Sequence, residues 1–137
     1  SGILVTKVIR KKSTNLKNFL IVDAAMNNLI RPTLYNAFHK IVPIVENKKD
    51  TFNKYDIVGP ICETGDYLGL DVNLPTIKSN EYLAILSSGA YGSVMRSNYN
   101  TRQDVPEILI YNNKDYILRK RENLDNIIEI DNIPEFN

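Results

Sequence analysis

The stretch PEILIYNNKDYILRKR, residues 106–121, carries the clearest structural pattern in the chain. Two runs of alternating apolar and polar residues flank the sequence Asn112-Asn113-Lys114-Asp115. Strict alternation is typical of a β-strand with one buried face, and Asn and Asp favour tight turns. The stretch therefore predicts a β-hairpin and favours a fold built from short strands.

Five other segments have a strand-like composition, and turn-forming residues separate them. Residues 66–75 are predicted to be irregular or partly extended, and no alternation of strands with long helices is present. Short helical segments are predicted after Asn28, with Pro32 in the first turn, and after Asn123. The chain is therefore predicted to be mainly β, a Greek-key-like barrel or sandwich with one or two short helices, in a single domain over residues 1–137. The five segments are residues 3–12, 19–25, 39–47, 55–61 and 81–89.

Composition and charge exclude several classes of function. The 137 residues include 17 Lys and Arg against 16 Asp and Glu, a net charge of +1, which gives no electrostatic basis for binding nucleic acid or an anionic membrane. Membrane spans need about 20 apolar residues in a run, and none is present. One Cys and one His cannot form a His/Cys zinc site within one chain, so no metal is predicted. The lone cysteine fits a reducing compartment, and the protein is predicted to be cytoplasmic.

The segment around Arg31 is the first candidate for chemistry. A guanidinium binds a carboxylate through two parallel hydrogen bonds, and Tyr35, four residues later, would share its face of a helical turn. The alternative is that Arg31 is an ordinary surface charge.

The second candidate is the loop GPICETGD, residues 59–66, which holds Cys62. Cys62 would be either a buried apolar residue or a thiol presented on the loop. A presented thiol can act as a proton donor, and the Glu63 carboxylate can hold an ammonium group. Neighbouring carboxylates would also favour the protonated thiol that a general acid needs.

The third candidate is the loop at residues 89–100, where glycines flank Tyr91. This pattern is compatible with close approach to an anion, although a glycine-rich loop alone is a weak signal. His39 is predicted to pack or cap structure and has no predicted catalytic role.

Three stretches together resemble a known family. VDAAMNNLIRPTLYNAFHKI, VGPICETGDYL and SSGAYGSVMRSNYN are similar in order and spacing to the C-terminal part of the diaminopimelate decarboxylases. In these pyridoxal-phosphate enzymes a (β/α)₈ barrel precedes a β-domain. The resemblance implies that this chain is the C-terminal β-domain without the barrel, and that it is inactive alone.

The resemblance also implies an activity and roles for five residues. The family converts meso-diaminopimelate to L-lysine and carbon dioxide in lysine biosynthesis, with pyridoxal 5'-phosphate bound to a lysine of the barrel. By resemblance, Arg31 and Tyr35 hold the distal carboxylate, and Glu63 binds the distal ammonium group. Cys62 matches the proton donor to Cα, and Tyr91 lies near the cofactor phosphate and the substrate. The implied assembly is a homodimer with shared active sites.

Two alternatives stay open at this stage. The chain could be the β-domain of a related ornithine-type or arginine-type decarboxylase, although a diamine substrate without a second carboxylate has no use for Arg31. It could also be a non-catalytic β-barrel interaction module.

Overall fold

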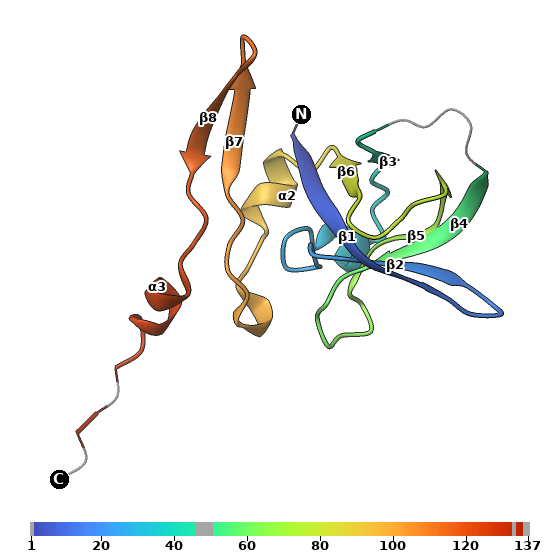
Figure 1. The fold of residues 1–137 in the computed structure, drawn as a ribbon. Helices are drawn as coiled ribbons and strands as arrows, with labels where there is room; N and C mark the ends of the chain where they lie inside the picture. The colour runs from blue at the N-terminus through green and yellow to red at the C-terminus, as the bar shows by residue number, and fades with distance from the viewer. Residues whose placement is uncertain (1, 46–50, 133, 136–137) are drawn as a thin grey trace. The chain divides into compact units, whose positions relative to one another are not determined.

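The computed structural model describes residues 2–45, 51–132 and 134–135 (Figure 1). The chain divides into two compact units, Ser1–Arg96 and Ser97–Asn137. The end of the strand predicted over residues 39–47 lies outside the described residues. That residues 1–137 form a single domain stays a prediction.

A six-stranded sheet makes up most of the first unit, with strand order β3-β6-β1-β2-β4-β5. The long strand β1 joins its two halves: Ile3–Lys7 pair with β6, and the part from Val8 onward pairs with β2. A bulge between Val8 and Arg10 marks the change of partner. Bulges bend a strand, so β1 curls the sheet toward closure. The strands are β1 (Ile3–Ser13), β2 (Asn18–Val22), β3 (Ile41–Pro43), β4 (Phe52–Val58), β5 (Tyr67–Pro75) and β6 (Tyr82–Leu86).

The two outer strands of this order, β3 and β5, meet. A Cβ atom added to Gly69 of β5 would lie 2.9 Å from Cδ1 of Ile41 in β3. Glycine therefore lets the Ile41 side chain lie directly on the β5 backbone. The result is a nearly closed, barrel-like sheet, which confirms the mainly β prediction. The segment expected to be irregular or partly extended is a regular nine-residue strand.

Aliphatic side chains fill the interior of this sheet. Strand β6 shows the cause, because Leu83 and Ile85 alternate into the core and are fully buried. Burying a side chain of this size contributes about 1.5–3 kcal/mol. The main core cluster comprises Val8, Leu20, Val22, Ala24, Leu29, Ile41, Tyr55, Ile57, Leu68, Leu74, Ile77, Leu83 and Ile85.

Short helices follow two of the strands. Helix α1 (Arg31–Tyr35) has Pro32 in its first turn, as predicted, but its N-cap is Ile30. The prediction that Asn28 caps this helix is wrong. The Asn28 side chain accepts the backbone N–H of Ala25 at 3.0 Å, so it closes the preceding turn instead.

Helix α2 (Ala90–Val94) occupies a segment for which the sequence predicted a loop. Its first turn closes through the N–H of Ser93, which donates to the Gly89 carbonyl at 2.7 Å. A Cβ atom at Gly92 would lie 3.0 Å from Cδ1 of Leu29, so the helix packs closely on the turn before α1. This tertiary contact outweighs the low helix propensity of the Gly-Ser sequence.

The second unit contains the predicted hairpin, β7 (Glu107–Tyr111) and β8 (Lys114–Arg119). Its turn is shorter than predicted, because Asn112 and Asn113 both adopt positive φ, 51° and 56°. Asn tolerates this conformation, which a two-residue hairpin turn requires. The 3₁₀ helix η1 (Tyr99–Thr101) precedes the hairpin, and α3 (Leu124–Ile128) follows it. The described residues thus form three short α-helices, where one or two were predicted.

Asn123 caps α3 as predicted. Its side-chain oxygen accepts the backbone N–H of Asp125 at 3.3 Å. This is the usual N-cap arrangement, in which a short polar side chain satisfies a backbone donor of the first turn.

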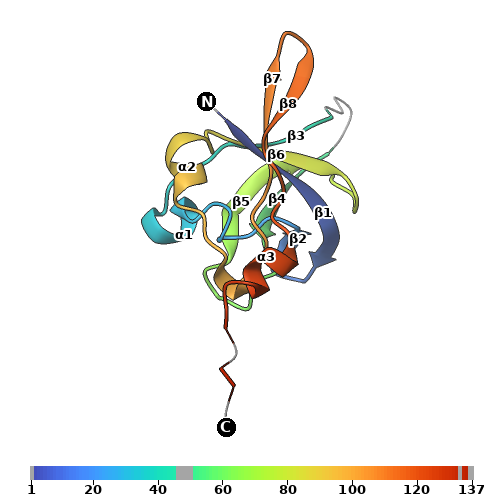
Figure 2. The same ribbon diagram turned by 90° about the vertical axis from the view of Figure 1, so that its left-hand side faces the viewer.

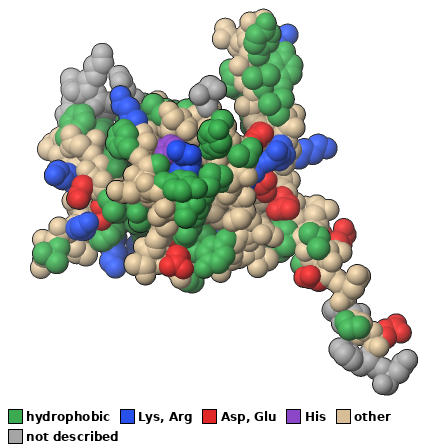
Figure 3. Space-filling model, turned by 180° about the vertical axis from the view of Figure 1, so that it is seen from behind, with side chains coloured by type: hydrophobic (Ala, Val, Ile, Leu, Met, Phe, Trp, Pro, Cys, Tyr) green, Lys and Arg blue, Asp and Glu red, His purple; other side chains and the backbone are tan. Residues whose placement is uncertain are grey.

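The hairpin carries exposed apolar residues on both of its faces. Ile108 and Ile117 are paired on one face, whereas Leu109 and Tyr116 are paired on the other, and all four are exposed. Hydrophobic side chains cover the face of the hairpin drawn in Figure 3. A two-stranded sheet is marginally stable in water by itself and leaves strand edges unpaired.

We expect the 137-residue chain to self-associate through this hairpin. Ile110, 69% exposed, is the side chain to change. In sedimentation over a concentration series, the average mass should rise for the wild-type chain and rise much less for Ile110→Lys. Leu16→Lys is the matched control, because Leu16 is 93% exposed in the β1–β2 turn. A wild-type chain that stays monomeric at high concentration would contradict the expectation.

Candidate functional site

Helix α1 brings Arg31 and Tyr35 onto one face. The helix ends at Asn36, which adopts the left-handed conformation with φ 53°. One helical turn separates residues 31 and 35, and the guanidinium carbon of Arg31 lies 5.8 Å from the centre of the Tyr35 ring. The proximity predicted from their spacing is therefore present.

Tyr91 of α2 joins this pair. The guanidinium carbon of Arg31 lies 5.9 Å from the centre of the Tyr91 ring, so Arg31 contacts two phenol rings at cation–π distance. Figure 2 shows α1 and α2 side by side at one end of the barrel. Three of the five predicted site residues thus lie together, from segments about 60 residues apart in sequence.

Cys62 lies on the turn that connects β4 to β5. The preceding residue, Ile61, is buried with Ala25 and Met26, whereas the Cys62 thiol is free and exposed. The thiol is therefore presented on the surface and does not fill the core.

Glu63 follows on the same exposed turn. Its carboxylate accepts the N–H of Thr64 at 3.1 Å, and its own N–H donates to the Ile61 carbonyl at 2.8 Å. The carboxylate stays on the exposed side of the turn, next to Cys62 in sequence.

Two hydrogen bonds tie this turn and the first residue of β5 to helix α1. The Thr33 hydroxyl donates to the Gly65 carbonyl, and the Tyr67 hydroxyl donates to the Pro32 carbonyl at 3.3 Å. A Cβ atom at Gly65 would lie 2.6 Å from Cγ2 of Thr33, so the two segments are in close contact. The cysteine turn is therefore held against the helix that carries Arg31.

In the sequence, Asp66 is recognisable only as another carboxylate near the Cys62 thiol. In the structure its side chain is buried and accepts two backbone N–H groups, from Met26 and Ile61. It therefore does not serve as an exposed neighbour of Cys62. In the sequence, only the turn-forming residues around Asp66 indicate that its side chain binds backbone N–H groups. They do not indicate which N–H groups it binds.

His39 is buried, as its predicted packing role requires. Its Nδ1 lies 3.0 Å from the carbonyl oxygen of Leu86, at the end of β6, and His39 itself lies in the segment between α1 and β3. The ring therefore ties the segment after α1 to the strand that leads to α2.

Within residues 2–45, 51–132 and 134–135, no three His, Cys, Asp or Glu side chains gather in a way that could hold a metal ion. Over those ranges no helix has the length and apolar character to cross a membrane.

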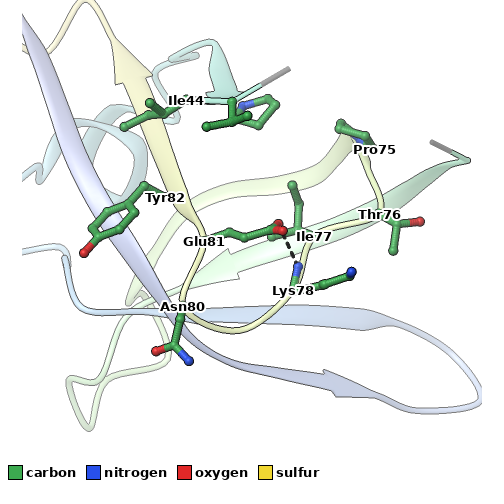
Figure 4. A pocket seen from close by; sticks show the side chains of 10 residues that line it. Ile44, Pro75, Thr76, Ile77, Lys78, Asn80, Glu81 and Tyr82 are labelled. Carbon is green, nitrogen blue, oxygen red and sulfur yellow. Dashed lines mark hydrogen bonds between the residues drawn. The ribbon is translucent and has the colours of Figure 1, made fainter. Parts of the chain in front are cut away.

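A pocket of about 570 Å³ opens at the other end of the barrel (Figure 4). It lies where β3 and β5 end, at Pro43 and Pro75, and where β6 begins, at Tyr82. Glu81 in its wall accepts the backbone N–H of Lys78 at 2.9 Å. The predicted site residues adjoin the opposite ends of these strands, so none of them lines this pocket.

Comparison with known proteins gives a family. Residues 1–89 match the C-terminal sheet domain of the pyridoxal-dependent decarboxylases. The chain belongs to this family. The matched region spans the barrel and contains the positions of four of the five predicted site residues, and Tyr91 follows it.

Relatives named diaminopimelate decarboxylase align with nearly the whole chain. The protein from Aquifex aeolicus is 52% identical over 129 residues, which cover 94% of this chain. The protein from Vibrio cholerae is 47% identical over 133 residues, which cover 97%. The chain spans about 30% of the length of these relatives. The predicted resemblance is confirmed.

Solved structures agree with the sequence relatives. A diaminopimelate decarboxylase from M. jannaschii in complex with L-lysine superposes with a TM-score of 0.91, is 32% identical, and matches 96% of this chain and 30% of its own. The Helicobacter pylori diaminopimelate decarboxylase, also with L-lysine, has a TM-score of 0.85 and 38% identity, over 93% of this chain and 31% of its own. An arginine decarboxylase from Paramecium bursaria Chlorella virus shares the fold, with a TM-score of 0.65 and 17% identity.

Proposed function

We propose that this chain is the C-terminal domain of a pyridoxal-phosphate enzyme that converts meso-diaminopimelate to L-lysine and carbon dioxide. The observation that carries the proposal is the placement of Arg31 against Tyr35 and Tyr91, next to a turn that presents an exposed thiol. In the complete enzyme of this proposal, this domain follows a cofactor-binding barrel in one polypeptide.

Arg31 would bind the distal carboxylate of the substrate. The planar guanidinium offers two parallel N–H donors to a carboxylate. The rings of Tyr35 and Tyr91 contact the guanidinium, and the two hydroxyls add donors of their own. A site that demands this carboxylate rejects amines that lack it, because donors that the complete enzyme would bury around the substrate would stay unpaired.

Glu63 would bind the distal ammonium group, and Cys62 would supply a proton. The bond from Cα to its carboxylate breaks, carbon dioxide leaves, and the proton of the Cys62 thiol moves to Cα. Solvent then returns a proton to the thiolate. The exposed turn leaves both side chains open to a substrate, and the ties to α1 hold that turn beside Arg31.

The side chains near Tyr91 fit the pyridoxal-phosphate cofactor. The phenol O–H of Tyr91 is a suitable donor to a phosphate, and the contact with Arg31 holds the Tyr91 ring on an exposed helix. When bound, the cofactor supplies the electron sink for the carbanion. The lysine that binds it belongs, in this proposal, to the barrel and not to these 137 residues.

The assembly and the compartment are part of the same proposal. The complete enzyme would be a homodimer with shared active sites, because Cys62 and Glu63 project from the domain surface where a second subunit can complete the site. A free exposed thiol persists in a reducing compartment, which supports a cytoplasmic location.

The test compares the complete enzyme with the isolated chain. We expect lysine and carbon dioxide from meso-diaminopimelate only with the complete enzyme and pyridoxal phosphate, and no product from the 137-residue chain under the same conditions. Ornithine and arginine are the control substrates. A preference for either of them would favour the related decarboxylases, and a folded, cofactor-loaded enzyme inactive on all three would favour an interaction module.

A further inference from the structure

Asp66 is a buried carboxylate that uses both of its oxygens. Its exposed fraction is 4%. Oδ1 accepts the N–H of Met26 at 2.7 Å, and Oδ2 accepts the N–H of Ile61 at 2.6 Å. A buried carboxylate needs such donors, and a buried N–H that loses its acceptor also costs free energy. Both N–H groups therefore depend on the Asp66 side chain for their acceptor.

The two donors belong to the two segments that carry the site. Met26 lies in the stretch that leads from β2 to α1, and Ile61 directly precedes Cys62. Gly59 leaves room for the carboxylate, because a Cβ atom there would lie 2.5 and 2.6 Å from the Asp66 oxygens. One side chain thus joins the start of the cysteine turn to the approach of the Arg31 helix.

Thr33 makes a second connection between the same segments. Its hydroxyl donates to the carbonyl of Gly65, one residue before Asp66. The first connection lies before helix α1 and the second lies within it. Two connections at separate points restrict rotation of the turn as well as its distance from the helix.

We propose that Asp66, assisted by Thr33, is a positioning residue that sets the Cys62 thiol relative to Arg31. The inference rests on the proposed function, in which the thiol delivers its proton while Arg31 holds the far end of the substrate. A change in the relative position of the two groups moves the proton donor away from Cα.

Asp56 provides a matched control. It is also buried, with 5% exposed, and accepts two donors: Lys17 Nζ at 2.7 Å and the Asp71 N–H at 2.8 Å. The bond to Asp56 raises the pKa of Lys17 above its ordinary value. Asp56 joins β4 to the β1–β2 turn and to β5, and it contacts neither α1 nor the cysteine turn by hydrogen bonds. Asp56→Asn therefore makes the same chemical change away from the site.

The experiment measures kcat, KM and Tm for Asp66→Asn and Asp56→Asn in the complete enzyme, well below both Tm values. An amide offers one acceptor oxygen where two N–H groups need one each. We expect Asp66→Asn to lower kcat/KM by about tenfold to 10²-fold, as small misplacements of reacting groups do. Asp56→Asn should lower Tm and leave kcat/KM within about twofold. Equal kcat/KM in the two variants would overturn the proposal.

A second measurement separates this inference from the proposed function. Hydrogen–deuterium exchange of residues 23–30 and 59–66 should become faster in Asp66→Asn and stay unchanged in Asp56→Asn, whatever the substrate. Unchanged exchange in Asp66→Asn would contradict the inference even in an active enzyme. If Asp66→Asn does not fold, Thr33→Val decides, because Thr33 is only partly buried. Its kcat/KM should fall severalfold, and wild-type values would overturn the proposal.

Discussion

Replacing Cys62 with alanine in the complete enzyme is expected to lower kcat by about 10²–10⁴-fold, the range for loss of a general acid. The KM for meso-diaminopimelate should change little, because the thiol in this proposal acts on the reacting carbon and does not hold either end of the substrate. Both constants follow from initial rates of carbon dioxide release.

Stability should not account for this loss. The Cys62 side chain is exposed, and surface substitutions usually change the free energy of unfolding by less than about 0.5 kcal/mol. Cys62→Ser is the matched control, because serine is similar in size. It replaces the S–H donor with an O–H donor, whose pKa is far higher than that of a thiol. It should retain more activity than alanine and much less than wild type.

The configuration of the deuterium-labelled product provides the decisive readout. In heavy water, the wild-type enzyme should place one deuterium, in a single configuration, on the carbon that lost its carboxylate. If Cys62 delivers that proton, the alanine variant should form its residual product with mixed configuration. A variant with near wild-type turnover and one configuration would show that the thiol is not the proton donor.

Local patterns accounted for most of the strands and for one helix cap. Alternating residues predicted the hairpin at Glu107–Arg119, and an Asn before an apolar spacing predicted the cap of α3. Both depend on neighbours in the sequence. The strand Tyr67–Pro75 was predicted only as irregular or partly extended, because Gly69 is typical of irregular segments, whereas here it makes room for Ile41 from another strand.

The contacts of the candidate site also fall into two groups, those that follow from local sequence spacing and those that depend on the tertiary structure. The Arg31–Tyr35 contact follows from helical spacing and was predicted without a tertiary structure. The contact of Arg31 with Tyr91 depends on α2, which forms because Gly92 packs against Leu29. No local pattern shows which distant segment a turn will meet, so neither this contact nor the role of Asp66 could be predicted from the sequence.

Removing the Arg31 side chain is expected to damage recognition of the substrate and not the reaction itself. Hydrogen bonds to charged groups contribute about 1.5–3 kcal/mol each, and 1.4 kcal/mol corresponds to a tenfold change. Loss of two parallel bonds in Arg31→Ala should therefore lower kcat/KM for meso-diaminopimelate by about 10²-fold or more. Arg31→Lys keeps the charge but not the planar pair of donors, so it should recover only part of this loss.

D-Lysine tests which end of the substrate Arg31 contacts. It has the same reacting centre and distal ammonium group as meso-diaminopimelate but lacks the distal carboxylate. The wild-type enzyme should strongly prefer meso-diaminopimelate, and Arg31→Ala should lose most of this preference while its slow rate with D-lysine stays unchanged. Arg10→Ala, at an exposed position of β1, controls for loss of a surface charge and should behave as wild type. If Arg31→Ala lowers kcat/KM equally for both substrates, then Arg31 acts at the reacting end or on the cofactor phosphate, and the assignment to the distal carboxylate is wrong.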